Sequence, residues 1–498
     1  MTASSPSTAA PTAVIPPVAG AAAAASRQVG EREVDRHVVR SIGWQGGKIA
    51  VQIAQYVILA RMVPPAEYGK FALALPIMTL LSALNDGGLS TAAVTGRHYD
   101  KRLASDLYLT QIGLGLAMAV VMALLAPVLA GVYGVPDLRE IGWWLALCLA
   151  INAWALQPKA LLRRQLKVGG LAMVEIAGVV AGLAAAVVST RFVSGFGLLV
   201  VAQVTSVAVG AIIAMAVAPV RLARFRGEGS YRHALEIGRH MVASDVLNAA
   251  RSQIPAMALG FFVVLHEVGL FNRANQLLSL PLLVLAPALT NFLLPLLARD
   301  VAYPERRRSH VQRTLRLLLT ATIPACVWIA VGPDDLLAWV LGEDWRPAVA
   351  ILSSLSPLFL VQIIAVISSI SMVSAERSRA VRRFAIWNLL LTGAVVLGAA
   401  PFGVMALALG LSISGLLLRG PLVVMLALRE RTLERADVML ALRLVLTLGI
   451  AAALLLVICG YLPVSPVMRE IAGLVAITAL SGIALFRVMR GGPREATL

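Results

Sequence analysis

Charged residues are scarce in this sequence. Only 14% of its 498 residues are Asp, Glu, Lys or Arg, whereas 59% are hydrophobic. A soluble protein of ordinary composition carries about 25% charged residues, which excludes a chain of several soluble domains. Apolar runs of about 20 residues, the length that crosses the core of a bilayer, recur along the whole chain. The composition therefore predicts an all-α, polytopic helical membrane protein.

The residues that build disulfides, metal sites and nucleotide-binding loops are also few or badly spaced. Cys148, Cys326 and Cys459 lie far apart inside apolar runs, and none of the six histidines has metal-ligand spacing with another ligand. No glycine-rich loop ends in Lys followed by Ser or Thr, so direct use of ATP is not predicted. Short predicted loops leave no room for a soluble catalytic domain. We expect no catalytic residue, no metal and no cofactor.

What the sequence does contain is a series of about 14 candidate spans. They lie roughly at residues 40–62, 69–95, 106–131, 140–160, 171–189, 196–219, 238–263, 268–297, 313–332, 347–374, 384–400, 403–428, 440–460 and 467–489. The longest loop on the predicted outer side, 333–346, carries four acidic residues and two tryptophans. We expect a re-entrant turn or a short helix there, at the membrane surface.

Basic residues are distributed unevenly between the two sides of these spans. Of the 43 Lys and Arg residues, 33 lie in the tails and alternate loops of one side, five in the loops of the other side, and five inside spans. This excess predicts that both termini are cytoplasmic. The net charge of +17 then faces anionic lipid headgroups, and we expect no nucleic acid partner. No Lys or Arg precedes Arg27 to start a signal peptide, so residues 1–37 are predicted to be a disordered cytoplasmic tail.

A repeat organises the chain. Residues 59–74 and 259–274 align without a gap and share six of sixteen residues, where about one or two would match by chance. The identical pairs are Leu59 and Leu259, Val63 and Val263, Glu67 and Glu267, Gly69 and Gly269, Phe71 and Phe271, and Ala74 and Ala274. The alternative is that any two membrane hairpins of such composition look similar.

Both copies are predicted to begin on the cytoplasmic side, which gives parallel repeats. The expected organisation is the tail (1–37), an N-lobe of six spans (38–219), a cytoplasmic inter-lobe linker (220–237), a C-lobe of six spans (238–430) and a C-terminal helical hairpin with a short tail (431–498).

Polar residues inside the spans suggest a central cavity between the lobes. Lys48, Gln52 and Gln55 share one face of the first span, and Asn248 lies with Arg251 on the equivalent span of the second repeat. The predicted substrate-binding residues are Lys48, Gln52, Gln55, Asn248, Arg251, Arg273 and Arg419. Their positive charge suits an anion, above all a phosphate. Internal ion pairs and side chains that extend to the membrane surface are the alternatives.

Acidic residues inside spans are the candidates for ion coupling. A carboxylate in a cavity of low dielectric can take up a proton or a cation, which points to Asp86 and Asp245. Asp86 precedes Gly87 and Gly88, so it could instead mark a capped kink. Glu175 lies close to the predicted inner surface and could pair with a basic loop.

Five stretches resemble the polysaccharide transporter family of Wzx-type lipopolysaccharide and exopolysaccharide flippases. This family lies in the superfamily that includes the multidrug and toxin extrusion transporters. The stretches are 63–71, with Glu-Tyr-Gly-Lys-Phe; 86–92, with Asp-Gly-Gly-Leu-Ser; 164–175; 269–281, with Gly-Leu-Phe-Asn-Arg-Ala; and 341–348, with Gly-Glu-Asp-Trp-Arg. They occur in family order between about residues 40 and 430.

The resemblance implies a flippase of the bacterial inner membrane. It would move an undecaprenyl-diphosphate-linked oligosaccharide to the periplasmic leaflet by alternating access coupled to an ion gradient. Polysaccharide polymerase or export machinery is a further candidate partner. The main alternative is a small-molecule or cation antiporter of the multidrug and toxin extrusion type, but a cationic cargo fits a basic cavity poorly. A membrane glycan polymerase or ligase is disfavoured because it would carry a long periplasmic loop.

Overall fold

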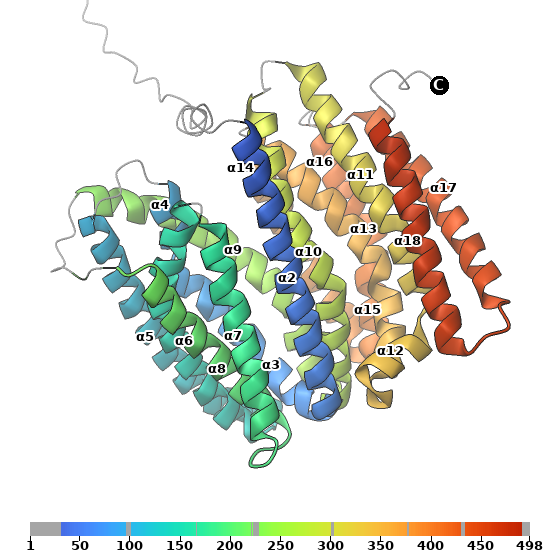
Figure 1. Ribbon diagram of the computed structural model, residues 1–498. Helices are drawn as coiled ribbons and strands as arrows, with labels where there is room; N and C mark the ends of the chain where they lie inside the picture. The colour runs from blue at the N-terminus through green and yellow to red at the C-terminus, as the bar shows by residue number, and fades with distance from the viewer. Residues whose placement is uncertain are drawn as a thin grey trace, which may run out of the picture.

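The structure, a computed structural model, describes residues 31–95, 101–165, 167–220, 222, 229–299, 303–375, 378–429 and 434–490. Every regular element in these ranges is helical (Figure 1). Ten helical segments are long and apolar enough to cross a membrane, so the chain is an all-α, multi-pass membrane protein. The other four expected spans coincide with α2, α3, α9 and α10. The total of 14 spans stays a prediction.

The first part of the chain, which we call the N-half, runs from α2 to α8. Its helices are α2 (Glu31–Met62), α3 (Pro65–Asp86), α4 (Leu89–Thr95), α5 (Lys101–Tyr133), α6 (Asp137–Arg164), α7 (Val168–Ser189) and α8 (Phe196–Val217). The α2 helix begins at Glu31, inside the stretch expected to be a disordered tail, and residues 1–30 of that tail lie outside the described residues.

The second part, which we call the C-half, runs from α9 to α16. Its elements are α9 (Gly229–Phe262), α10 (Leu265–Arg299), α11 (Pro304–Val331), α12 (Asp334–Leu341), the short 3-10 turn η1 (Glu343–Trp345), α13 (Pro347–Ser374), α14 (Ser378–Ala399), η2 (Ala400–Phe402), α15 (Val404–Ser414), the π-helical segment η3 (Gly415–Arg419) and α16 (Gly420–Arg429). The short helix expected within 333–346 is confirmed as α12. Because α9 begins at Gly229, the end of the predicted linker is helical.

The two repeat hairpins, α2–α3 and α9–α10, turn at the same position two hundred residues apart. In the first, the N–H of Val63 donates to the carbonyl of Leu59 at 2.9 Å; in the second, Val263 donates to Leu259 at 3.0 Å. The next helix starts at residue 65 in one copy and 265 in the other. The sequence repeat is therefore also a repeat of local structure.

The C-terminal hairpin, α17 (Arg435–Gly460) and α18 (Pro466–Arg490), packs against α11 beside the C-half (Figure 1). At one end, Arg308 forms an ion pair with Glu434 at 2.9 Å, and the Gln312 amide donates to Asp437. At the other end, Trp328 Nε1 donates to the Glu470 carbonyl at 3.3 Å. The hairpin is thus fastened to the C-half near both of its ends.

One hydrophobic core runs through both halves. Buried residues of α3, such as Leu73, belong to the same cluster as Leu259 on α9 and Phe271 on α10. The halves therefore share apolar contacts, which stabilise the arrangement in which they are seen.

Candidate functional site

The two halves meet at backbone distance through Gly69 and Gly269. This contact lies near one end of the bundle, which we call the lower end, as it is drawn in Figure 1. The lower end carries the turns 63–64, 134–136, 190–195, 263–264 and 461–465. A Cβ atom on Gly69 would lie 1.9 Å from the Leu265 carbonyl oxygen, and one on Gly269 would lie 2.0 Å from that of Pro65. The contact is reciprocal, as expected if a pseudo-twofold axis runs between α3 and α10. We call it the seam.

Beside the seam, Arg273 of α10 is fully buried among three aromatic rings. Its guanidinium carbon lies 4.2 Å from the ring centre of Tyr68, 5.2 Å from Trp345 and 5.3 Å from Tyr56. None of its three side-chain nitrogens has a hydrogen-bond partner among the described residues. The ring faces attract the cation, but they do not replace the hydrogen bonds that a guanidinium makes in water.

Two basic residues inside the N-half spans, Lys48 and Lys70, are paired with carboxylates. Lys48 Nζ lies 2.7 Å from Glu175 Oε2, which joins α2 to α7. Lys70 Nζ lies 2.6 Å from Glu67 and 2.8 Å from Asp137. The positive charge expected from Lys48 in a cavity is balanced by an internal ion pair in this arrangement.

Two basic residues inside the C-half spans, Arg251 and Arg419, have no such partner in the described part of the chain. Among the residues that the structure describes, no carboxylate lies within ion-pair distance of Arg251 or Arg419. The charge of Arg251 acts on the Arg419 guanidinium electrostatically. Two of the predicted anion-binding residues, one on α9 and one at the end of η3, therefore lie within electrostatic range of each other.

Arg419 is held by neutral groups. Its Nη1 donates to Thr392 Oγ1 at 3.4 Å, and its Nη2 donates to Ser414 Oγ at 3.1 Å and to the Leu411 carbonyl. Its Nε has no partner among the described residues. The residue ends the π-helical segment η3, a distortion that occurs frequently at functional sites. Neutral acceptors position this guanidinium and leave its charge uncompensated.

Three other predicted cavity residues lie on the repeat-equivalent helices. Gln52 and Gln55 of α2 are half-buried, and Asn248 of α9 is exposed. That these side chains line a common cavity stays a prediction.

The two candidate coupling carboxylates come from opposite halves. Asp86 ends α3, where Gly87 and Gly88 have positive φ and interrupt the predicted second span before α4. Its Oδ1 accepts hydrogen bonds from Ser90 and, at 3.4 Å, from Gln111. Asp245 of α9 lies within electrostatic range of Asp86. In the described part of the chain, no group of three or more His, Cys, Asp or Glu residues forms a metal site.

Sequence reasoning did not identify the partners of these residues. The ring of Tyr56, the capping carboxylate of Glu470 and the guanidinium of Arg61 carry no motif, and each acts on a helix remote in sequence. A signal was available only for Arg61 and Glu470. Both are charges placed at predicted span ends, where capping of other helices is common.

Two bacterial proteins of polysaccharide biosynthesis are similar to this chain in sequence. The chain is 23% identical over 374 residues to the lipopolysaccharide biosynthesis protein WzxC of Escherichia coli (strain K12), covering 73% of this chain and 74% of that protein. It is also 23% identical to the succinoglycan biosynthesis transport protein ExoT of Rhizobium meliloti (strain 1021), covering 64% and 65% of the two chains.

Solved structures of transporters share the fold. The lipid II flippase MurJ, in an inward closed conformation, superposes with a TM-score of 0.74 at 12% identity, covering 91% of this chain and all of that chain. An inward-facing multidrug resistance MATE family transporter superposes with a TM-score of 0.57 at 15% identity, covering 80% and 96%. The profile of the polysaccharide biosynthesis protein family matches residues 58–350, more than half of the sequence. The chain belongs to the polysaccharide biosynthesis protein family.

Proposed function

We propose that this protein is a flippase for a lipid-linked oligosaccharide that carries a phosphate or diphosphate. Its cargo would be an undecaprenyl-diphosphate-linked precursor of lipopolysaccharide or exopolysaccharide, moved across the bacterial inner membrane. Family membership supports the substrate class, and the fold shared with a lipid flippase and with drug transporters supports transport. Alternating access of two six-helix lobes, within 14 spans, follows from the repeat.

The observation that carries the proposal is the uncompensated pair Arg251 and Arg419. Arg419 is buried and Arg251 half-buried, they lie within electrostatic range of each other, and no carboxylate of the described residues lies within ion-pair distance of either, so an anion would stabilise them. Arg presents a fixed fork of donors that matches phosphate oxygens. We assign the diphosphate to this pair, with Asn248, Gln52 and Gln55 as candidates for the sugar hydroxyls.

Coupling to an ion gradient would use Asp86 and Asp245. Two carboxylates from opposite halves that lie within electrostatic range of each other repel when both are ionised. A proton or a cation between them would favour the arrangement in which α3 and α9 touch. In this scheme the lower end is periplasmic and both termini are cytoplasmic, as the distribution of basic residues predicts.

A reconstituted transport assay tests the function. Proteoliposomes would contain a fluorescent undecaprenyl-diphosphate oligosaccharide, and a membrane-impermeant quencher would report how much reaches the far leaflet, with and without a proton or sodium gradient. Protein-dependent movement is expected, and its response to the gradient would identify the coupling ion. No movement, together with gradient-driven efflux of a small organic cation, would replace the proposal with an antiporter of the multidrug and toxin extrusion type.

A further inference from the structure

The short helix α12 lies at the lower end, between α2 of the N-half and α18 of the C-terminal hairpin. It has eight residues, too few to be stable alone in water. Its N-cap position is Pro333, which supplies no side-chain cap. The helix therefore depends on groups from other elements to satisfy its ends.

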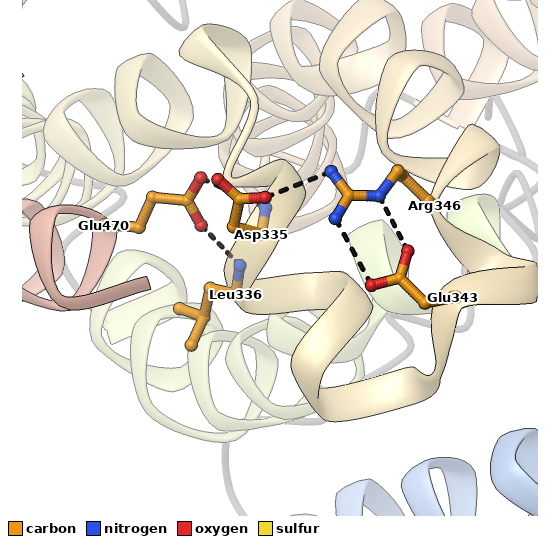
Figure 2. Close-up of polar contacts among 5 residues, drawn as sticks. All are labelled: Asp335, Leu336, Glu343, Arg346 and Glu470. Atoms are coloured by element: carbon orange, nitrogen blue, oxygen red, sulfur yellow. Dashed lines mark hydrogen bonds and ion pairs between the residues drawn. The ribbon is translucent and has the colours of Figure 1, made fainter. Parts of the chain in front are cut away.

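At the N-terminus of α12, the cap comes from α18. The Glu470 carboxylate accepts hydrogen bonds from the backbone N–H of Asp335, at 3.1 Å, and from that of Leu336, as Figure 2 shows. These N–H groups have no partner within the helix, and the positive end of the helix attracts a carboxylate. Glu470 thus performs the role of an N-cap from more than one hundred residues away.

At the C-terminus of α12, the partner comes from α2. Arg61 Nε donates to the Val340 carbonyl at 2.8 Å, and its Nη2 donates to the Trp339 carbonyl. The last carbonyls of a helix lack partners, and its negative end attracts a cation. One residue away on α2, the Ala60 carbonyl accepts a bond of 2.8 Å from Trp345 Nε1.

Local ion pairs join α12 to η1. Arg346 lies 3.1 Å from Asp335 of α12 and 2.9 Å from Glu343 of η1 (Figure 2). Trp345, which lies between Glu343 and Arg346 in sequence, is also one of the three aromatic rings around Arg273 beside the seam. A displacement of α12 would therefore also move Trp345 relative to Arg273.

We propose that α12 and η1 form a latch across the lower end, and that the C-terminal hairpin holds this latch on the N-half through Glu470. The inference rests on the alternating access in the proposed function, because a latch matters only if the lower end opens. It gives α17 and α18, which lie outside the repeat, a role in conformation: α18 holds one end of α12 and α2 holds the other.

The test is a distance measurement by pulsed electron paramagnetic resonance on the full-length protein in lipid nanodiscs. Spin labels at Phe192→Cys and Phe402→Cys would report the lower end, because both side chains are highly exposed and lie between helices of opposite halves, Phe192 in the turn after α7 and Phe402 in η2. Cys459 would be replaced by Ser, since it is half-buried, whereas Cys148 and Cys326 are buried. Loss of a helix cap is expected to raise the ratio of open to closed lower ends about fivefold in Glu470→Ala.

The matched control is Arg469→Ala. Arg469 is the neighbour of Glu470, but its guanidinium donates to the Val464 and Gly460 carbonyls of its own hairpin, so the ratio should stay at the wild-type value. Arg61→Ala should shift the ratio in the same direction as Glu470→Ala. The double variant should not exceed the larger single effect, because the two residues act in series on one helix.

Two outcomes would overturn the latch. If Arg61→Ala opens the lower end and Glu470→Ala does not, the hairpin has no part in it. If all variants keep the wild-type distances, α12 does not control this end. Because the readout is a distance and needs no cargo, a protein that moves a different substrate gives the same result, and failure of the flippase assay stays distinguishable.

Discussion

The two halves treat the positive charges inside their spans differently. In the N-half, Lys48 and Lys70 are each within 2.8 Å of a carboxylate. In the C-half, no carboxylate of the described residues pairs with Arg251, Arg273 or Arg419. The turn of the repeat hairpins nevertheless lies at the same position in both halves.

This difference separates cations that are neutralised by a carboxylate from cations that are free to bind an anion. An ion pair that is already neutral has little attraction left for an anion, whereas a desolvated, unpaired guanidinium gains strongly from one. The repeat thus supplies one scaffold twice, and the side chains make its C-half the candidate anion site. The predictions below test this contrast, in order of expected effect.

The largest effect should come from removing a C-half arginine. Arg251→Ala and Arg419→Ala should each abolish transport while the protein still inserts and accumulates. Loss of one partner from a buried charged contact should weaken binding of the diphosphate lipid by about 30-fold or more. The measurements are the initial rate in the proteoliposome assay and binding of the fluorescent lipid. Wild-type transport by either variant would remove that residue from the site.

The next effect concerns the seam. Gly269→Val places a side chain where a Cβ already lies 2.0 Å from the Pro65 carbonyl oxygen. The closed lower end should lose about 1–3 kcal/mol, so the spin-label distances should shift toward the open population. Gly449→Val on α17 is the control, because no heavy atom lies within 4 Å of its built Cβ. Unchanged distances in Gly269→Val would mean that α3 and α10 do not need this close approach.

The variant Arg273→Met tests whether the unpaired, buried charge of Arg273 contributes to the stability of the fold. Replacement of Arg273 by Met keeps much of the volume and removes the charge. We expect stability within about 1 kcal/mol of wild type, because replacing a buried charge by an apolar group is often neutral, and slower transport. Thermal unfolding in detergent and the transport rate measure the two quantities. A large loss of stability with normal transport would make the aromatic cage structural.

A smaller effect is expected from the N-half pair. The double variant Lys48→Gln and Glu175→Gln removes both charges of a half-exposed ion pair, which should change stability by less than about 1 kcal/mol and leave transport near wild type. The single variant Lys48→Gln leaves Glu175 unpaired and should be worse than the double. If the double variant abolishes transport, the N-half charge is part of the site and the contrast between the halves fails.

The smallest effect is expected at Glu343, which is exposed in η1. The hydrogen bond from Arg346 lowers the pKa of this carboxyl, so its contribution is present above the unfolded pKa and is lost as the pH falls through the lowered folded value. Solvent screens an exposed pair, and Glu343→Gln should leave the unfolding temperature unchanged between about pH 5 and 8. A lower unfolding temperature of Glu343→Gln than of the wild type across that pH range would show that the pair of Glu343 and Arg346 stabilises the latch.

Much of the fold was predictable because its signals are local. Apolar runs of membrane length set the helices, and the turn at 63–64 recurs at 263–264 because the same residues surround it. The candidate site was predictable as residue types only. The sequence singled out Lys48 and Arg251 equally, since both are cations on equivalent spans. Their different surroundings depend on Glu175 and on Arg419, which lie on other helices.

The sequence by itself therefore determined the membrane class, the repeat and its turns, because hydrophobic length and turn geometry act on neighbouring residues. Only the tertiary structure decided which charges are neutralised, which rings surround Arg273 and which carboxylate caps α12. Those outcomes depend on distances of a few ångströms between helices far apart in the chain, over which electrostatic and hydrogen-bond energies change most steeply.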